Sequence, residues 1–282
     1  VYRCISIMGG FPEAHVVATN TSWQRFSTPP TEELFDLSIL IAIICMFPVI
    51  ISTMPDMQSL LEEKDSRVQT LTFLMGCSET AYFLVIFVTL FVISIVPYIL
   101  MSAFLCYGFV MTGTSFSLMF VISVLFVLAQ ICFLMFLTTF MKKASMGRIT
   151  TVVFLVLTVF FGYIHYFYTL DGSNSSEAVK HVFSVLPFSC YQMVMMTMYM
   201  QSRTSMPAID WSMVNDANLP YRIWYGILWL IVDSILYFLL FLLFNLTNSR
   251  DFGSPLLSWK ELFHKDAWRR LFKKEYNFMS GR

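Results

Sequence analysis

The chain has 282 residues, of which 57% are hydrophobic and 13% are charged, and its 18 basic side chains balance its 18 acidic ones. A soluble domain carries about 25% charged residues, so this composition excludes an ordinary soluble globule and a disordered chain. The balanced charge gives no reason to expect nucleic acid as a partner. Because the chain begins at Val1 without a signal sequence, we expect it to be part of a longer protein.

Five apolar stretches are long enough to cross a bilayer, which takes about 20 residues per helix. They lie at residues 35–53, 81–105, 116–140, 149–168 and 223–246. A sixth apolar stretch, 183–200, contains Pro187 and several polar residues. It can therefore either span the membrane or enter it and turn back.

The basic residues decide between five spans and six, because cytoplasmic loops carry the excess of Lys and Arg. With five spans and the N-terminus outside, five of the 18 basic residues lie outside and thirteen inside. The outside residues are Arg3, Arg25, Lys180, Arg203 and Arg222. A sixth span would put the larger share outside. We therefore expect an all-α membrane bundle of five spans, with a re-entrant helical segment at about 183–200 on the outer side.

Two glycosylation sequons agree with this topology. Asn20 and Asn174 both begin an Asn-x-Ser/Thr sequence, and both fall outside in the five-span arrangement. Asn245 also begins such a sequence, but it lies at the inner end of the last span. We expect glycans at the first two sites and none at the third.

Residues 60–76, between the first two spans, form the most informative polar stretch. Apolar residues recur there at helical spacing, namely Leu61, Val68, Leu71 and Met75. Glu63 precedes Arg67 by one helical turn, and Gly76 is a typical helix stop. The pattern predicts an amphipathic helix on the inner side, with Glu63, Lys64 and Arg67 on its charged side. Such a helix either rests on lipid headgroups or acts as a lever that presses on a cytoplasmic partner.

Asp233 lies near the middle of the last predicted span. A charged residue there costs a few kcal/mol on insertion scales, so it needs a partner or water. It is either a gating or substrate-contacting group, or a structural carboxylate capped by Ser, Tyr or Arg of a neighbouring helix. His165, in the fourth span, is a second ionisable residue, and a lone His in a span is more often a packing residue.

The remaining reactive and basic residues suggest no catalytic centre. The six cysteines do not have zinc-site spacing, so we expect no metal site. Residues 260–274 alternate basic with aromatic and aliphatic side chains. This segment either binds anionic lipid headgroups or connects to a further cytoplasmic domain.

Several of these segments together resemble the A subfamily of ATP-binding cassette transporters. Glu63-Lys64-Asp65-x-Arg67-Val68, followed by Met75-Gly76, is similar to that family's Glu-Lys-Glu-x-Arg-Leu and Met-Gly signature. Asp233 to Tyr237 is similar to its Asp-x-x-Leu-Tyr element. Gly253, Pro255 and Trp259 resemble its Tyr-Gly-x-Pro-x-x-Trp region. The resemblance extends over about residues 35–260.

This resemblance implies a membrane domain of the ABC-2, or type V exporter, kind. Residues 1–34 would be the end of an exoplasmic domain, 35–247 the transmembrane domain, and 248–282 a connector toward a nucleotide-binding domain. ATP and magnesium would bind to that domain, because the chain has no Gly-x-x-x-x-Gly-Lys-Ser/Thr sequence. The implied partners are membrane lipids, the nucleotide-binding domains and a second membrane half. The implied location is the plasma membrane or an endomembrane compartment.

Four functions compete at this stage. The resemblance favours an ATP-driven lipid mover in which the helix at 60–76 is the coupling helix. An exporter of another ABC-2 subfamily with a non-lipid substrate is the alternative within the same class. An intramembrane enzyme usually needs paired catalytic groups in its spans, and Asp233 by itself does not provide a pair. A channel needs polar residues lining several helices, and these spans offer few.

Overall fold

The computed structural model of the protein describes residues 44, 47–108, 111, 113–141, 143–170, 177–204, 209–216 and 219–247. These residues are helical, with connecting turns and no β-strand. The chain divides into two compact units, Val1–Leu37 and Ser38–Arg282, and the described residues belong to the second. The first unit, the predicted connector at 248–282, Asn20 and Asn174 lie outside the described residues.

Within the described part of the chain, three helices are long and apolar enough to cross a membrane: α5 (Glu79–Tyr107), α6 (Phe116–Thr138) and α10 (Ile223–Thr247). They coincide with the spans predicted at 81–105, 116–140 and 223–246. The predicted span at 149–168 lies within the single helix α7 (Ala144–Leu170). Helix α3 (Phe47–Asp65) contains the end of the span predicted at 35–53, most of which lies outside the described residues.

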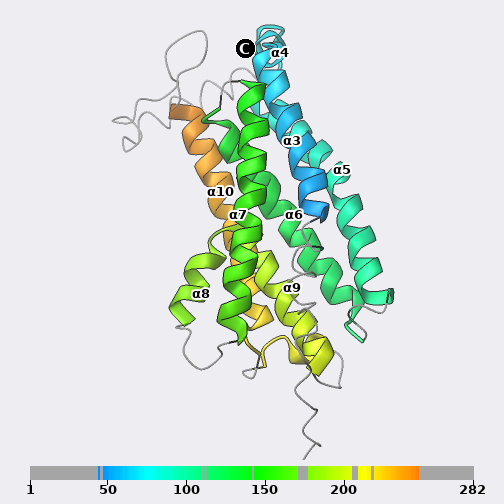
Figure 1. The fold of residues 1–282 in the computed structure, drawn as a ribbon. Helices are drawn as coiled ribbons and strands as arrows, with labels where there is room; N and C mark the ends of the chain where they lie inside the picture. The colour runs from blue at the N-terminus through cyan, green and yellow to red at the C-terminus, as the bar shows by residue number, and fades with distance from the viewer. Residues whose placement is uncertain are drawn as a thin grey trace, which may run out of the picture. The chain divides into compact units, whose positions relative to one another are not determined.

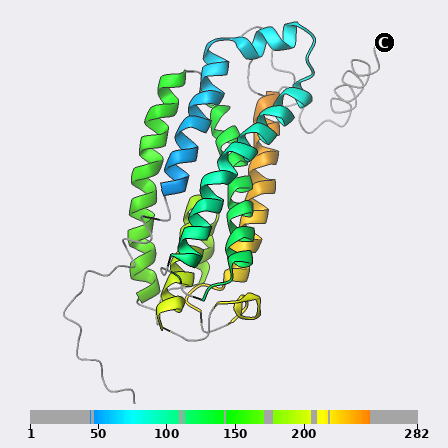
Figure 2. The same cartoon turned by 90° about the vertical axis from the view of Figure 1, so that its right-hand side faces the viewer.

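Helix α6 lies at the centre of the bundle. It packs against α10, α5, α3 and the shorter helix α9 (Pro187–Thr204), and α3 also packs against α7. Figures 1 and 2 show these long helices side by side, with α4 (Val68–Leu74) lying across one end. The core is rich in aromatic rings. Phe126 stacks on Tyr191 at a centroid distance of 4.2 Å, and Phe133 meets Tyr237 edge to face at 4.8 Å.

The prediction of a single amphipathic helix over 60–76 is wrong, because one helix ends at Asp65 and a second begins at Val68. Arg67 has a φ of 59°, a left-handed conformation that disfavours helix continuation in a residue with a Cβ. The Ser66 hydroxyl donates to the Glu62 carbonyl at 2.6 Å, which satisfies the last turn of α3. Residues 60–65 therefore continue the long helix α3, and α4 is a separate element.

Gly76 ends α4 with a φ of 95°. The Cys77 amide donates to Thr72 O at 3.2 Å, and the Gly76 amide donates to Phe73 O at 3.1 Å. These are the two bonds of a Schellman motif, which requires a left-handed residue at this position. The glycine allows the chain to leave α4 and enter α5 within a few residues.

The segment predicted to be re-entrant, 183–200, lies across two helices, α8 (Glu177–Ser184) and α9. The Lys180 ammonium donates to Pro220 O, just before α10 begins. The turn after α8 lies much further along α10, because the Tyr237 hydroxyl donates to Val185 O at 2.8 Å. Helix α9 then returns, and its Cys190 thiol contacts Gly226 O near the start of α10. The pair thus enters the bundle and returns toward the same end.

Candidate functional site: the α4 end of the bundle

Helix α4 exposes a row of apolar side chains at the end of the bundle. Val68, Leu71, Leu74 and Met75 have exposed fractions of 47%, 56%, 78% and 81%. On the other side of α4, the Phe73 ring packs edge to face against Tyr82 of α5 at 5.2 Å. The Phe73 ring also lies 6.5 Å from the Phe83 ring of α5. Helix α4 is therefore attached to α5 through aromatic contacts of Phe73, and its outer side is exposed for contact with a partner or a lipid surface.

The residues predicted to form the charged side of a coupling helix lie in different places. Glu63 and Lys64 belong to α3, are half-buried and face the bundle. The Tyr82 hydroxyl donates to Glu63 Oε2 at 2.5 Å, and Lys64 Nζ donates to Thr138 O, at the end of α6, at 2.8 Å. Arg67 is exposed in the turn between α3 and α4.

Asp65, which the sequence analysis named only as part of the family motif, also links the end of α3 to another helix. Its Oδ2 accepts a hydrogen bond from the Ala144 amide, at the start of α7, at 3.3 Å. One turn earlier in α3, Leu61 is fully buried and packs against α7. A Cβ added to Gly147 of α7 would lie 2.5 Å from Leu61 Cδ1. The glycine therefore allows the Leu61 side chain to lie directly against α7, and a larger residue at position 147 would displace that side chain.

An acidic surface hollow lies beside these contacts. It is lined by Ser59, Glu62, Glu63, Asp65 and Ser66. Glu62 is exposed, and its Oε1 accepts a hydrogen bond from Gln58 Nε2 at 2.6 Å within the same helix. Among the described residues, no group of three or more His, Cys, Asp or Glu side chains could hold a metal ion.

Deeper in the bundle, a buried polar network joins α3, α5 and α6. Gln130 of α6 donates from Nε2 to Ser52 Oγ at 2.9 Å and to Thr53 Oγ1 at 2.8 Å, and it accepts from the Tyr98 hydroxyl at 2.5 Å. The Ser52 and Tyr98 hydroxyls also lie 3.3 Å apart. These four side chains are at most 5% exposed. Their hydrogen bonds hold three helices together where apolar contacts alone allow sliding.

Asp56 extends this network by one turn along α3. The Ser94 hydroxyl donates to Asp56 Oδ2 at 2.5 Å, and Asp56 is 3% exposed. The sequence analysis missed this site. The signal was present in the spacing, because Ser52 and Asp56 are four residues apart, as are Ser94, Tyr98 and Ser102. Polar residues at that spacing share one helix face.

Asp233 lies fully buried on α10, as its central position in the predicted span suggested. Neither of its carboxyl oxygens has a hydrogen-bond partner among the described residues. The capping Ser, Tyr or Arg that we considered is thus not found in that part of the chain. The nearby Tyr237 hydroxyl bonds instead to the α8–α9 turn. The role of Asp233 stays a prediction, and the side chain of His165 lies outside the described residues.

At the opposite end of the bundle, aromatic and basic residues hold α8 against the start of α10. Trp229 Nε1 donates to His181 Nδ1 at 3.0 Å, and the His181 ring lies 5.2 Å from the Tyr225 ring. The Ser184 and Tyr221 hydroxyls lie 2.9 Å apart, and burial raises the pKa of Tyr221 well above its usual value. Tryptophan and tyrosine are typical of the interface between lipid and water.

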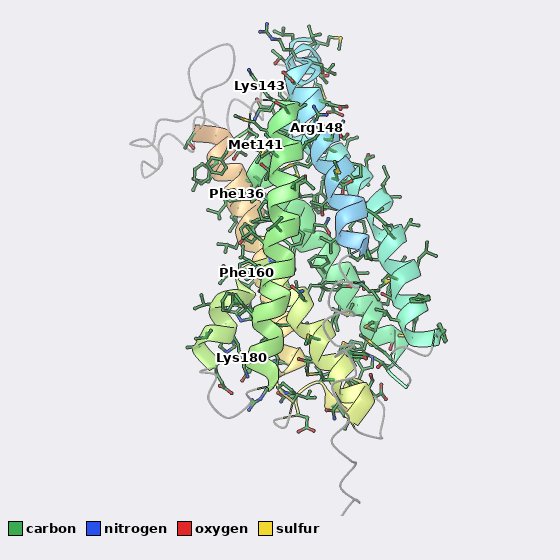
Figure 3. All side chains as sticks on the ribbon, viewed as in Figure 1. Phe136, Met141, Lys143, Arg148, Phe160 and Lys180 are labelled. Atoms are coloured by element: carbon green, nitrogen blue, oxygen red, sulfur yellow. The ribbon has the colours of Figure 1, made fainter. Side chains whose placement is uncertain are left out.

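The basic residues are unequally shared between the two ends. Figure 3 shows Lys143 and Arg148 at the end that carries α4, and Lys180 at the opposite end. Lys64 and Arg67 also lie at the α4 end, next to α4 in the chain. Arg203 of α9 and Arg222, just before α10, lie toward the same end as Lys180, so the described basic residues divide four to three in favour of the α4 end.

Comparison with known proteins gives a family match and one distant relative. Residues 7–243 match the family described as ABC-2 family transporter protein. The chain is also similar to ATP-binding cassette sub-family A member 17 of Rattus norvegicus, with 24% identity over 241 residues. That similarity covers 84% of this chain and 13% of the relative, so the chain spans a small part of the relative's length. Both matches agree with the resemblance found in the sequence motifs.

Proposed function

The chain belongs to the ABC-2 family of transporters, and from this premise we propose that it is the membrane domain of an ATP-driven transporter of lipids or other amphiphiles. It is an integral, multi-pass membrane protein. ATP and magnesium would bind to a nucleotide-binding domain in another part of the full protein or in a partner chain. The observation that carries the proposal is α4, an exposed apolar helix fixed across the basic end of the bundle.

In this proposal α4 is the coupling helix that contacts the nucleotide-binding domain. Its outer row, which ends with Leu74 and Met75, is apolar, and the exposed Arg67 lies in the turn just before it. Protein–protein interfaces typically have an apolar centre and a polar rim. The alternative, a helix resting on lipid headgroups, is less well supported because acidic residues beside it would face the anionic inner leaflet.

The topology that we propose has five spans, with α4 inside and the α8–α9 pair outside. The share of basic residues in the five-span arrangement, thirteen inside against five outside, supports this orientation. The aromatic cluster around His181 and Trp229 is consistent with a lipid–water interface at the other end. A helical pair that enters from the outer side and returns suits an amphiphile, because a lipid can approach from the side with its tails still in the bilayer.

The proposed substrate class is supported by the apolar faces of the spans. Helix α5 exposes aliphatic side chains along its length, from Leu84 at 65% to Leu100 at 66%. The buried polar network around Gln130 joins three helices to one another and does not line a path for a water-soluble solute. A substrate whose tails remain in lipid needs no such path.

The test is ATP-dependent movement of lipid by the full-length protein in proteoliposomes. Headgroup-labelled fluorescent phospholipids report the movement through quenching by an impermeant reductant, and a non-hydrolysable ATP analogue provides the control. We expect movement with ATP and none with the analogue. The lipid proposal is wrong if no lipid probe is moved and none stimulates ATP hydrolysis, while a water-soluble solute is transported. That result would support the non-lipid exporter.

A further inference from the structure

We propose that Glu63, Lys64 and Asp65 form a three-way anchor that passes the movement of α4 to three other helices, and that they do not contact the nucleotide-binding domain. This inference rests on the proposed transport function and assigns a positioning role to residues within it. Three consecutive side chains reach α5, α6 and α7 respectively. Together with α3 itself, four helices meet at the base of the coupling helix.

The charges of two anchor residues match the helix ends that they contact. Lys64 Nζ reaches the Thr138 carbonyl at the C-terminus of α6, where the helix dipole favours a positive charge. Asp65 Oδ2 accepts a hydrogen bond from the Ala144 amide at the N-terminus of α7, where the helix dipole favours a negative charge. A short turn joins these two helix ends. The pair Lys64–Asp65 therefore holds both sides of that turn.

Glu63 supplies the link to α5, on the other side of the coupling element. The Tyr82 hydroxyl donates a hydrogen bond to Glu63, and the Tyr82 ring packs edge to face against Phe73 of α4. One residue of α5 thus contacts both the end of α3 and the C-terminal end of α4. A displacement of α4 changes the position of Tyr82 directly and the position of Glu63 through it.

The rest of α3 is rigidly attached, so that motion at its end is transmitted and not absorbed. Leu61 packs on Gly147 of α7, and two turns earlier Ser52 and Thr53 join Gln130 of α6. Helix α3 and helix α4 are separate elements, because the left-handed backbone of Arg67 lies between them. Movement of α4 about this turn would be transferred by the anchor to the ends of the spans.

Two pairs of variants test the anchor. Tyr82→Phe removes the hydroxyl that reaches Glu63, and it keeps the ring that packs on Phe73. Its control is Tyr107→Phe, in an exposed tyrosine at the other end of the same helix. Asp65→Ala removes the contact to α7, and its control is Glu62→Ala, which removes the same charge from another exposed acid of α3. The Tyr82 hydroxyl points to Glu63, so its removal tests the link between α3 and α5.

The first measurement is transport per ATP hydrolysed by the full-length protein in proteoliposomes. We expect Tyr82→Phe and Asp65→Ala to lower this ratio roughly two- to fivefold, with ATP hydrolysis and thermal stability near wild type. The controls should behave as wild type. If Glu62→Ala lowers the ratio as much as Asp65→Ala, or if Tyr82→Phe has no effect, the anchor is rejected in favour of a direct contact by this acidic surface.

A second measurement separates this inference from the transport function. Spin labels at Leu74 of α4 and Met146 of α7, both exposed, report the distance between these helices without any substrate. We expect a narrow distance distribution in the wild type and in Glu62→Ala, and a broader one in Asp65→Ala. Equal widths in all three proteins contradict the anchor even if transport occurs. If the distance distributions have the expected widths but no lipid is transported, the proposed function is contradicted and the anchor is supported.

Discussion

Replacement of Gln130 by Leu should destabilise the bundle by an amount set by three hydrogen bonds. Gln130 donates to Ser52 and Thr53 and accepts from Tyr98, and all four side chains are buried. Hydrogen bonds between membrane helices contribute about 0.6 kcal/mol each, so Gln130→Leu should cost about 2 kcal/mol. The Leu side chain has nearly the same volume, so the cost of a cavity is small.

The matched control is Ser123→Ala on the same helix. Its hydroxyl lies 2.8 Å from Ser102 Oγ and is likewise fully buried, but it makes one contact between helices and not three. The expected cost is therefore about 0.6 kcal/mol. Unfolding of the purified protein by SDS in mixed micelles measures both values. If Gln130→Leu is no more destabilising than Ser123→Ala, the network does not hold α3 to the bundle and the reasoning is refuted.

Two further predictions concern topology and packing. Asn20 and Asn174 should each lose a glycan-dependent gel shift when changed to Gln, whereas Asn245→Gln should change nothing, and a glycan at Asn245 would contradict the inner placement of that end of α10. Gly226→Ala should destabilise the protein by about 1–3 kcal/mol, because a Cβ would overlap the Val194 side chain of α9. Thermal unfolding should show that Val194→Ala restores part of this loss, and an equally destabilised double variant would rule out the contact.

The spans were predictable because hydropathy over about 20 residues is a property of the local sequence. Helices α5, α6 and α10 follow the predicted limits within a few residues. The family was predictable for a similar reason, since its motifs are short and contiguous. The predicted helix over 60–76 failed at Arg67, because the apolar spacing continues across the break and a left-handed arginine has no sequence signature.

The polar network could not be assembled from the sequence, although its members were visible. Ser52, Tyr98 and Gln130 come from three helices whose rotation and relative height depend on tertiary packing. Helical spacing shows which residues of one helix share a face, and it does not show which helix that face meets. Asp233 was identified because a carboxylate in a span is unusual on its own. Asp56 was missed because it lies just beyond the span predicted at 35–53.

The orientation of Glu63 and Lys64 shows why charged residues in a membrane protein need not face a partner. At the end of a bundle, the terminal carbonyls and amides of several helices need hydrogen-bond partners, and charged side chains supply them more strongly than neutral ones. Lys64 and Asp65 do this for α6 and α7. The apolar side chains of α4, which in a soluble protein would be buried, are the ones left exposed. At this end, the half-buried Glu63 and Lys64 face the bundle while the apolar row of α4 is exposed, and in the proposed function that row is where the nucleotide-binding domain binds.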